Sequence, residues 1–77
     1  MKIVVRSYGN LSDFLPPDGT QVEAEVPDGC TVVGMIRHFR VSPEHLWMVS
    51  VNDSVVGDES VLRPLDRVTL FTHITGG

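Results

Sequence analysis

The sequence has one cysteine, no long apolar run and no cluster of basic residues, and each lack excludes a class of protein. Because Cys30 is alone, no intramolecular disulfide can form, which excludes a small secreted scaffold held together by disulfides and fits a reducing compartment. No apolar run approaches the ~20 residues that a membrane helix requires. The segment 1–6 is too short and too soon charged for a signal peptide. We therefore expect a cytoplasmic protein with no membrane partner.

Basic charge is also scarce, with six Lys and Arg residues against ten Asp and Glu and a net charge of −4. A protein that binds nucleic acid through phosphates needs the opposite balance, so we expect no nucleic-acid partner. The three histidines, His38, His45 and His73, show no metal-ligand spacing among themselves or with Cys30. The sequence therefore predicts no metal site and no bound cofactor.

What the chain does have is enough apolar residues for one small core. Its 77 residues make a single domain, and 42% of them are hydrophobic. A chain of this size buries only about 60% of its unfolded surface, so the core must be economical. Thirteen residues are valine, and β-branched side chains favour strands.

Alternation of apolar and polar residues predicts strands, which we place at 2–8, 21–26, 47–51, 55–56 and 67–72. In the second of these, Val22, Ala24 and Val26 are predicted to face inward. In the last, Val68 and Leu70 share the inner face and Phe71 lies on the outer one. A short helical turn is predicted at 11–15, ended by two prolines.

One short helix is predicted between the second and third strands. Thr31 can cap it through its hydroxyl group. An apolar stripe with helical spacing follows and would face the sheet: Val32, Met35, Ile36 and Phe39. The resulting order, ββαβββ, predicts an α+β fold in which a mixed sheet of four to five strands packs on one helix.

The chain ends in Gly76-Gly77, a thin tail with an unhindered carboxylate. This ending has a chance frequency of roughly 0.5% at average glycine usage, so alone it is only suggestive. We divide the chain into a domain at 1–72 and a flexible tail at 73–77. Extended, the tail reaches about 16 Å beyond the domain.

The element order and several short motifs resemble the MoaD/ThiS superfamily of ubiquitin-like sulfur carriers. The segment 26–32 is similar to the "VPxGxTV" motif that opens the family's helix, and Met35-Ile36 stand where the family tends to carry paired leucines. Val51-Asn52-Asp53 resembles its "VNG" turn, the segment 61–68 its "xLxDGDxV" motif, and 71–77 its closing "hxxxxGG" segment. The resemblance implies a β-grasp (ubiquitin-like) fold.

Three positions depart from the family pattern. Asp53 replaces the turn glycine, which predicts a less tight turn. Pro64-Leu65-Asp66 replaces Asp-Gly-Asp, which leaves the geometry of the loop before the last strand open. Thr72-His73 stands where small subunits of molybdopterin synthase often carry Pro-Pro.

The resemblance also implies a function for the tail. Gly77 would be adenylated by an ATP-using activating enzyme and converted to a thiocarboxylate that delivers sulfur to a pathway intermediate. Gly76, Thr75 and Ile74 would be recognised by the partner, and Phe71 would contact it. The carrier would be a free monomer that contributes no catalytic residue, and ATP would be consumed only by its partner.

The acceptor of the sulfur is open between two branches of the superfamily. About thirty residues precede the helix, and Gly9-Asn10-Leu11-Ser12 resembles the "GxLR" segment of molybdopterin synthase small subunits. This favours delivery to a pterin precursor of the molybdenum or tungsten cofactor, with the synthase large subunit as partner. The alternatives are the thiamine thiazole, attachment of Gly77 to target lysines as a protein modifier, and an interaction module whose glycines have no chemical role.

Other residues admit a functional and a structural interpretation. Cys30 precedes a helix N-terminus, where a thiolate is favoured, but we favour its interpretation as a small packing residue in a turn. Trp47 can be core packing or a binding platform, and we favour packing. Phe71 and Ile74 are apolar residues outside the predicted core, and we favour partner contacts for both.

Overall fold

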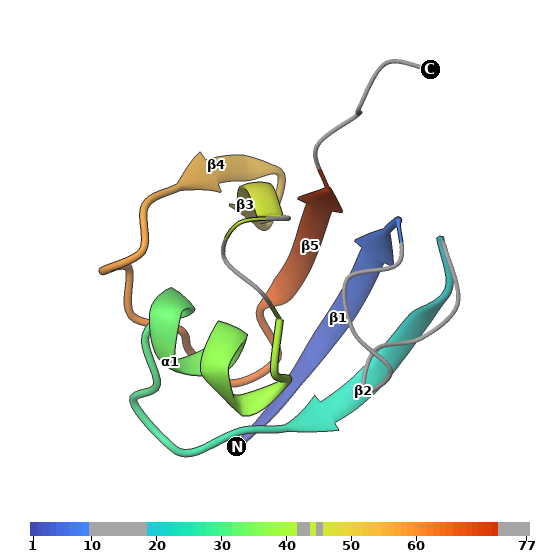
Figure 1. Cartoon of the computed structure of the whole chain (residues 1–77). Helices are drawn as coiled ribbons and strands as arrows, with labels where there is room; N and C mark the ends of the chain where they lie inside the picture. The colour runs from blue at the N-terminus through green and yellow to red at the C-terminus, as the bar shows by residue number, and fades with distance from the viewer. Residues whose placement is uncertain (10–18, 42–43, 45, 73–77) are drawn as a thin grey trace, which may run out of the picture.

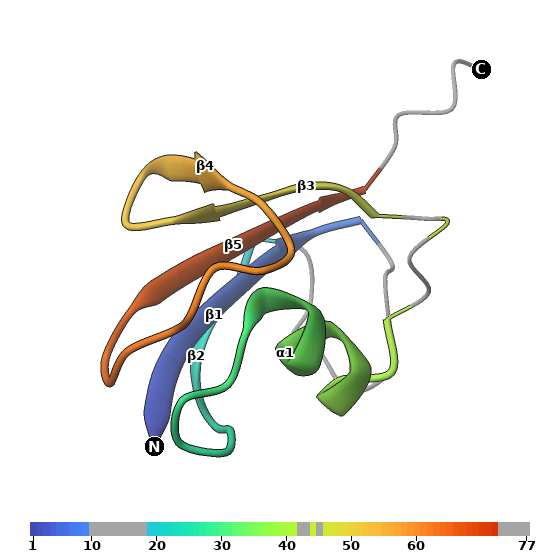
Figure 2. The same ribbon diagram turned by 90° about the vertical axis from the view of Figure 1, so that its left-hand side faces the viewer.

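The computed structural model describes residues 1–9, 19–41, 44 and 46–72, with the backbone alone at position 47. A single sheet curves over one helix (Figures 1 and 2). The elements follow the predicted order: β1 (Lys2–Tyr8), β2 (Gln21–Glu25), α1 (Val32–His38), β3 (Leu46–Val51), β4 (Ser54–Val56) and β5 (Arg67–Thr72). The helical turn predicted at 11–15 falls outside the described residues.

The sheet has five strands in the order β2-β1-β5-β3-β4. The two central strands, β1 and β5, run parallel, and the other neighbours are antiparallel. Figure 2 shows α1 on one face of this mixed sheet, with no described helix on the other. The predicted α+β fold of the β-grasp type is therefore confirmed. The division at residue 72 stays a prediction.

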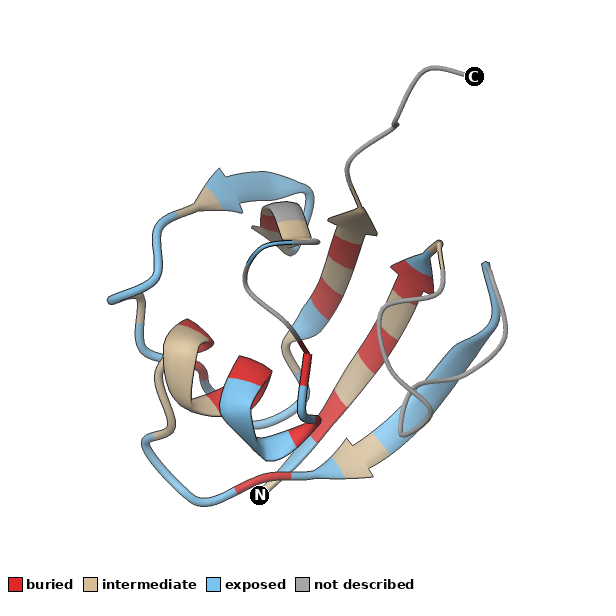
Figure 3. Ribbon diagram, viewed as in Figure 1, coloured by how far each residue is buried: buried red, intermediate tan, exposed pale blue. Residues whose placement is uncertain are grey.

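The core forms between the inner face of the sheet and the apolar stripe of α1. Buried and less buried residues alternate along β1 and β5, as the bands of Figure 3 show. This confirms the inner face predicted for Val68 and Leu70. The core consists of apolar side chains from β1, β3, β5, α1 and the segments that connect the elements: Ile3, Val5, Val26, Val32, Met35, Ile36, Phe39, Val41, Val49, Leu62, Val68 and Leu70.

The inward direction predicted for Val22 in β2 is confirmed by its register, but its burial is incomplete. Val22 pairs with Val5 and so shares its face, yet its side chain is 38% exposed, whereas Val26 just beyond the strand is buried. β2 is an edge strand, and α1 has only seven residues, about 10 Å of helix. A helix of that length leaves Val22 uncovered, so facing inward does not ensure burial.

The helix begins as predicted. The Thr31 hydroxyl accepts a hydrogen bond from the Gly34 N–H at 3.2 Å, which satisfies one of the free donors of the first turn. Phe39 follows as the C-cap and completes the apolar stripe. No helix in the described part of the chain is long and apolar enough to cross a membrane.

The prediction of a less tight turn at Asp53 is wrong. Asn52 and Asp53 have φ of 51° and 70°, and Val51 pairs with Ser54 across them, which makes a tight two-residue hairpin turn. The side chain of Asn52 stabilises it by donating to Asp66 Oδ1 and accepting from the Arg67 N–H, both at 3.0 Å. Because Asn and Asp tolerate the left-handed region better than most residues, these bonds suffice without glycine.

The loop before β5 contains a leucine in the left-handed backbone region. Leu65 stands at the glycine position with φ of 65°, and its N–H donates to the Lys2 carbonyl at 2.7 Å. The loop, whose geometry the sequence left open, thus includes local strain, since a left-handed leucine costs about 1–2 kcal/mol.

Replacing Leu65 by glycine should stabilise the protein by about 0.5–1 kcal/mol. The leucine side chain is 67% exposed, so little burial is lost, and the relief of strain outweighs the greater freedom of glycine in the unfolded chain. Chemical denaturation measures the difference. Val61→Gly is the control, since Val61 is similarly exposed but has no positive φ, and it should destabilise. Equal effects of the two substitutions would contradict strain at Leu65.

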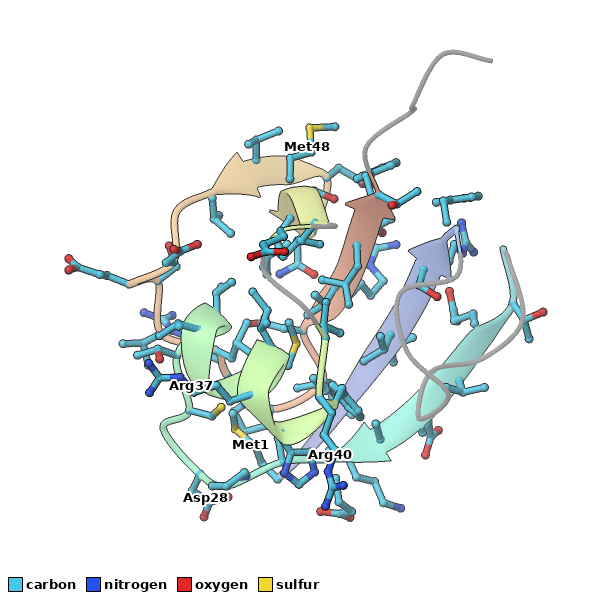
Figure 4. The ribbon with its side chains drawn as sticks, in the orientation of Figure 1. Met1, Asp28, Arg37, Arg40 and Met48 are labelled. Carbon is cyan, nitrogen blue, oxygen red and sulfur yellow. The ribbon has the colours of Figure 1, made fainter. Side chains whose placement is uncertain are left out.

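The start of β1 lies at the opposite end of the sheet from the end of β5. There the Met1 ammonium group donates to the Val26 carbonyl and to Asp28 Oδ1, both at 2.8 Å. The hydrogen bond to Asp28 raises the pKa of the ammonium group, and the same bond lowers the pKa of the Asp28 carboxyl. Figure 4 shows Met1 and Asp28 at this end, away from Met48.

Candidate functional site

The candidate site is the end of the sheet where β5 finishes. Of the residues assigned to it from the sequence, only Phe71 is described. Gly77, Gly76, Thr75 and Ile74 lie outside the described residues, and their roles stay predictions. Because β5 is central in the sheet, the chain leaves this end between β1 and β3.

Phe71 lies on the helix-free face, as predicted, and it has an aromatic neighbour there. It pairs in register with Tyr8 of the parallel strand β1, and the two rings stack at 5.5 Å between centroids and 14° between planes. Phe71 is half-buried, and Tyr8 is 37% exposed. The two stacked rings therefore form a partly exposed aromatic pair one residue before β5 ends.

A β-bulge lies on the other side of β5. Leu46 of β3 pairs with Thr72, but Met48 pairs with Phe71, so Trp47 is the extra residue on β3. Bulges bend a strand and re-aim its side chains, and they recur beside functional sites. The side chain of Trp47 is not among those described, so its predicted packing role stays a prediction.

Gly9 follows β1 at the same end of the sheet and lies beside Thr72, the last residue of β5. Its φ is 94°, in the region that favours glycine, and a Cβ there would lie 2.8 Å from the Thr72 Cβ. Real Cβ atoms essentially never approach so closely. A glycine is therefore required where the chain leaves β1, because the backbone passes directly against the last residue of β5.

The sequence model of one family, the ThiS family, matches residues 7–77, which include this site and the final two glycines. The chain belongs to the ThiS family. It is thus placed in the MoaD/ThiS superfamily of small ubiquitin-like carriers, as its motifs predicted. No curated protein matches the chain.

A solved structure agrees with this assignment at the level of the fold. The ThiS-family chain matches the crystal structure of SAMP1 from Haloferax volcanii with a TM-score of 0.67. The two chains share 14% sequence identity, and the match covers 100% of each. At that identity the match shows the fold alone.

Membership in the ThiS family gives the site its general role. Proteins of this family are small carriers that work with activating enzymes and with acceptor enzymes. Among the described residues, no group of three or more His, Cys, Asp and Glu side chains could hold a metal ion. Phe71, with its ring stacked on Tyr8, lies one residue before the end of β5, and its role as a partner contact stays a prediction.

The structure favours the packing interpretation of Cys30. The residue is half-buried against the core, its Sγ donates to the Thr31 carbonyl at 3.2 Å, and burial raises the pKa of its thiol. A raised pKa keeps the thiol protonated and disfavours a nucleophilic role. Of the histidines, only His38 is described, and its ring meets Phe39 edge-on at 5.2 Å.

Sequence reasoning missed three features of the site: the Tyr8 partner of Phe71, the role of Gly9 against Thr72, and the bulge in β3. Gly9 is visible in the sequence as part of a motif, but its close approach to Thr72 depends on the parallel register of β1 and β5. A pattern along one strand carries no information about which residue of a distant strand lies beside it.

Proposed function

We propose that this ThiS-family protein is a sulfur carrier whose reactive group is the Gly77 carboxylate. The supporting observation is that the family match extends to residue 77 while β5 ends at Thr72. Five residues remain after the strand, and extended they span about 16 Å. That length is sufficient to enter the active site of a partner while the domain stays outside.

The chemistry requires activation, because a carboxylate is a poor electrophile. In the adenylation step, a Gly77 carboxylate oxygen attacks the α-phosphorus of ATP in the activating enzyme, and pyrophosphate leaves. Hydrosulfide then attacks the acyl carbon and AMP leaves, which yields the thiocarboxylate. With an enzyme persulfide as donor, the same attack expels AMP and gives an acyl disulfide, and a thiol that is oxidised to a disulfide then cleaves the S–S bond to release the thiocarboxylate. Glycine at 76 and 77 presents no Cβ to obstruct either attack. Gly76, Thr75 and Ile74 are the residues that the partner recognises.

We place the delivery of sulfur in molybdopterin or tungstopterin synthesis, with a synthase large subunit as acceptor. The supporting feature is the connection between β1 and β2 at 9–20, which carries the segment similar to molybdopterin synthase small subunits. Delivery to a thiazole is the competing outcome and attachment to lysines is another; the experiment below separates them.

The test is intact mass spectrometry of the protein after incubation with ATP, an activating enzyme and a sulfur source. The expected product has gained the mass of an oxygen-to-sulfur exchange at Gly77. The purified product is then offered to a pterin-synthase large subunit and to a thiazole synthase. Turnover with the first supports the proposed acceptor, turnover with the second overturns it, and lysine-linked adducts in cell extract support a modifier. No exchange with any cognate activating enzyme contradicts the carrier function.

Substitution of Phe71 by alanine should weaken the encounter with the activating enzyme. A half-exposed aromatic residue next to the tail is the kind of side chain that dominates binding energy, and truncation of such a residue costs about 2 kcal/mol or more. We expect the KM for the carrier in the ATP–pyrophosphate exchange reaction to rise about 30-fold. Val55→Ala is the control, since Val55 is 67% exposed on β4 but pairs with Ser50 rather than with β5. Equal KM values for the two variants would show that Phe71 does not contact the activating enzyme.

A further inference from the structure

A pocket of about 80 Å³ lies between β1, β5 and the neighbouring turn, and two arginines and one carboxylate, that of Asp53, line it. Arg6 comes from β1 and Arg67 from β5, and the register pairs Val4 with Arg67 and Arg6 with Thr69. The two guanidinium groups are thus diagonal neighbours across a parallel strand pair. Arg6 alternates with the buried Val5 and Ser7, so its side chain belongs to the helix-free face.

The two arginines differ in how their charge is compensated. Arg67 lies 3.6 Å from the Asp53 carboxylate, and both side chains are largely exposed. Arg6 donates from Nη2 to the neutral Gln21 Oε1 at 3.2 Å and has no carboxylate partner among the described residues. Its Nε is shielded from solvent and has no acceptor within the described ranges. In a protein of net charge −4, Arg6 is therefore a half-buried cation with an unused donor.

We propose that this pocket receives one side-chain carboxylate, from Asp or Glu, of the activating enzyme that adenylates Gly77. Arg6 pairs with that carboxylate side-on through Nε and Nη2, the fork geometry in which guanidinium and carboxylate match. The incoming carboxylate replaces the amide oxygen of Gln21 as the acceptor of the Nη2 hydrogen bond. The Arg6 side chain rotates so that its Nε–H can also donate to the carboxylate. The identity of the partner rests on the proposed function.

The position of the pocket indicates a protein side chain as its occupant. Arg6 and Tyr8 are two apart on β1, and Thr69 and Phe71 are two apart on β5, so the pocket adjoins the Tyr8–Phe71 pair on one face. A partner that covers the aromatic pair also covers the pocket. A desolvated charge pair at a fixed distance from the end of β5 sets the register of the partner, which matters when a tail must reach one phosphorus atom.

The first experiment tests the chemistry of the pocket without any enzyme. Sodium acetate replaces sodium chloride at constant ionic strength while NMR follows the Nε–Hε signals of the arginines. We expect a saturable shift at Arg6. Arg37, an exposed arginine on α1 (Figure 4), is the internal control and should show only a small linear drift. Equal responses at Arg6 and Arg37 would overturn the proposal.

The second experiment tests the partner, by steady-state kinetics of ATP–pyrophosphate exchange with the activating enzyme. Arg6→Gln should raise the KM for the carrier about 10-fold or more and leave kcat within about twofold. Arg6→Lys keeps the positive charge but loses the two parallel donors of the guanidinium group, so its KM should lie between those of the wild type and Arg6→Gln. Lys2→Gln is the matched control, because Lys2 lies on the same strand and face, is 60% exposed, and pairs only loosely with Glu23 at 3.8 Å. It should change KM by less than about twofold.

The outcomes separate this inference from the proposed function. If the wild-type protein is adenylated and Arg6→Gln behaves like Lys2→Gln, the inference is wrong and the carrier function stands. If no activating enzyme modifies the wild-type protein, the carrier function fails and the partner named here fails with it. The acetate titration then still decides whether Arg6 binds a carboxylate. A thermal melt of Arg6→Gln like that of the wild type shows that a kinetic change is not unfolding.

Discussion

Deletion of Gly76 and Gly77 should abolish thiocarboxylate formation while the unfolding temperature of the protein stays unchanged. The deletion leaves the terminal carboxylate on Thr75, two residues short of its place in the activating enzyme and beside a Cβ, so the loss should exceed about 1000-fold, as expected when an essential reacting group is missing from the active site. Stability should persist because the hydrophobic core of the described chain lies between Ile3 and Leu70. Intact mass spectrometry measures the first quantity and differential scanning calorimetry the second.

A variant with one alanine added after Gly77 is the matched control for this deletion. It keeps both glycines but moves the carboxylate onto an alanine, whose Cβ obstructs the attacked carbon. We expect modification to fall strongly, though less than in the deletion. Sulfur incorporation that survives the deletion would place the chemistry elsewhere in the chain and contradict the role of Gly77.

The local elements of this fold could be predicted because their signals are local. Alternation placed β1 and β5 with their observed bounds, and the stripe from Val32 to Phe39 with its Thr31 cap placed α1. Each of these patterns depends on side chains that are close in the chain and meet one common face. The same logic gave the inward direction of Val22 but not its burial, which depends on whether a helix elsewhere is long enough to cover an edge strand.

The candidate site could be predicted only in part, because it depends on register between strands distant in sequence. Alternation within β5 alone is enough to assign Phe71 to the outer face. Its stacking on Tyr8 follows from the parallel pairing of the first strand with the last. Asp53 shows the same limit in a turn, since the bonds of Asn52 to Asp66 and Arg67 hold a conformation that the dipeptide alone would not favour.

Substitution of Gly9 by alanine should destabilise the protein by about 2–4 kcal/mol. Two costs add: a left-handed backbone for a residue with a Cβ, about 1–2 kcal/mol, and overpacking against Thr72, about 1–3 kcal/mol. The lower entropy of alanine in the unfolded chain offsets these by less than about 1 kcal/mol. Urea denaturation measures the change in the free energy of unfolding.

Two other glycines separate the two costs. Gly29 has φ of 73° but no atom within 4 Å of the point where a Cβ would lie, so Gly29→Ala should cost only the backbone term, about 1 kcal/mol. At Gly57 neither condition applies, and Gly57→Ala should be neutral within about 0.5 kcal/mol. If Gly9→Ala costs no more than Gly29→Ala, Thr72 moves aside freely and the contact does not hold the end of β5. If Gly9→Ala costs more than Gly29→Ala, the difference measures how strongly the contact with β1 holds the end of β5, from which the tail leaves. The folded fraction of Gly9→Ala should then also be adenylated more slowly than the wild-type protein.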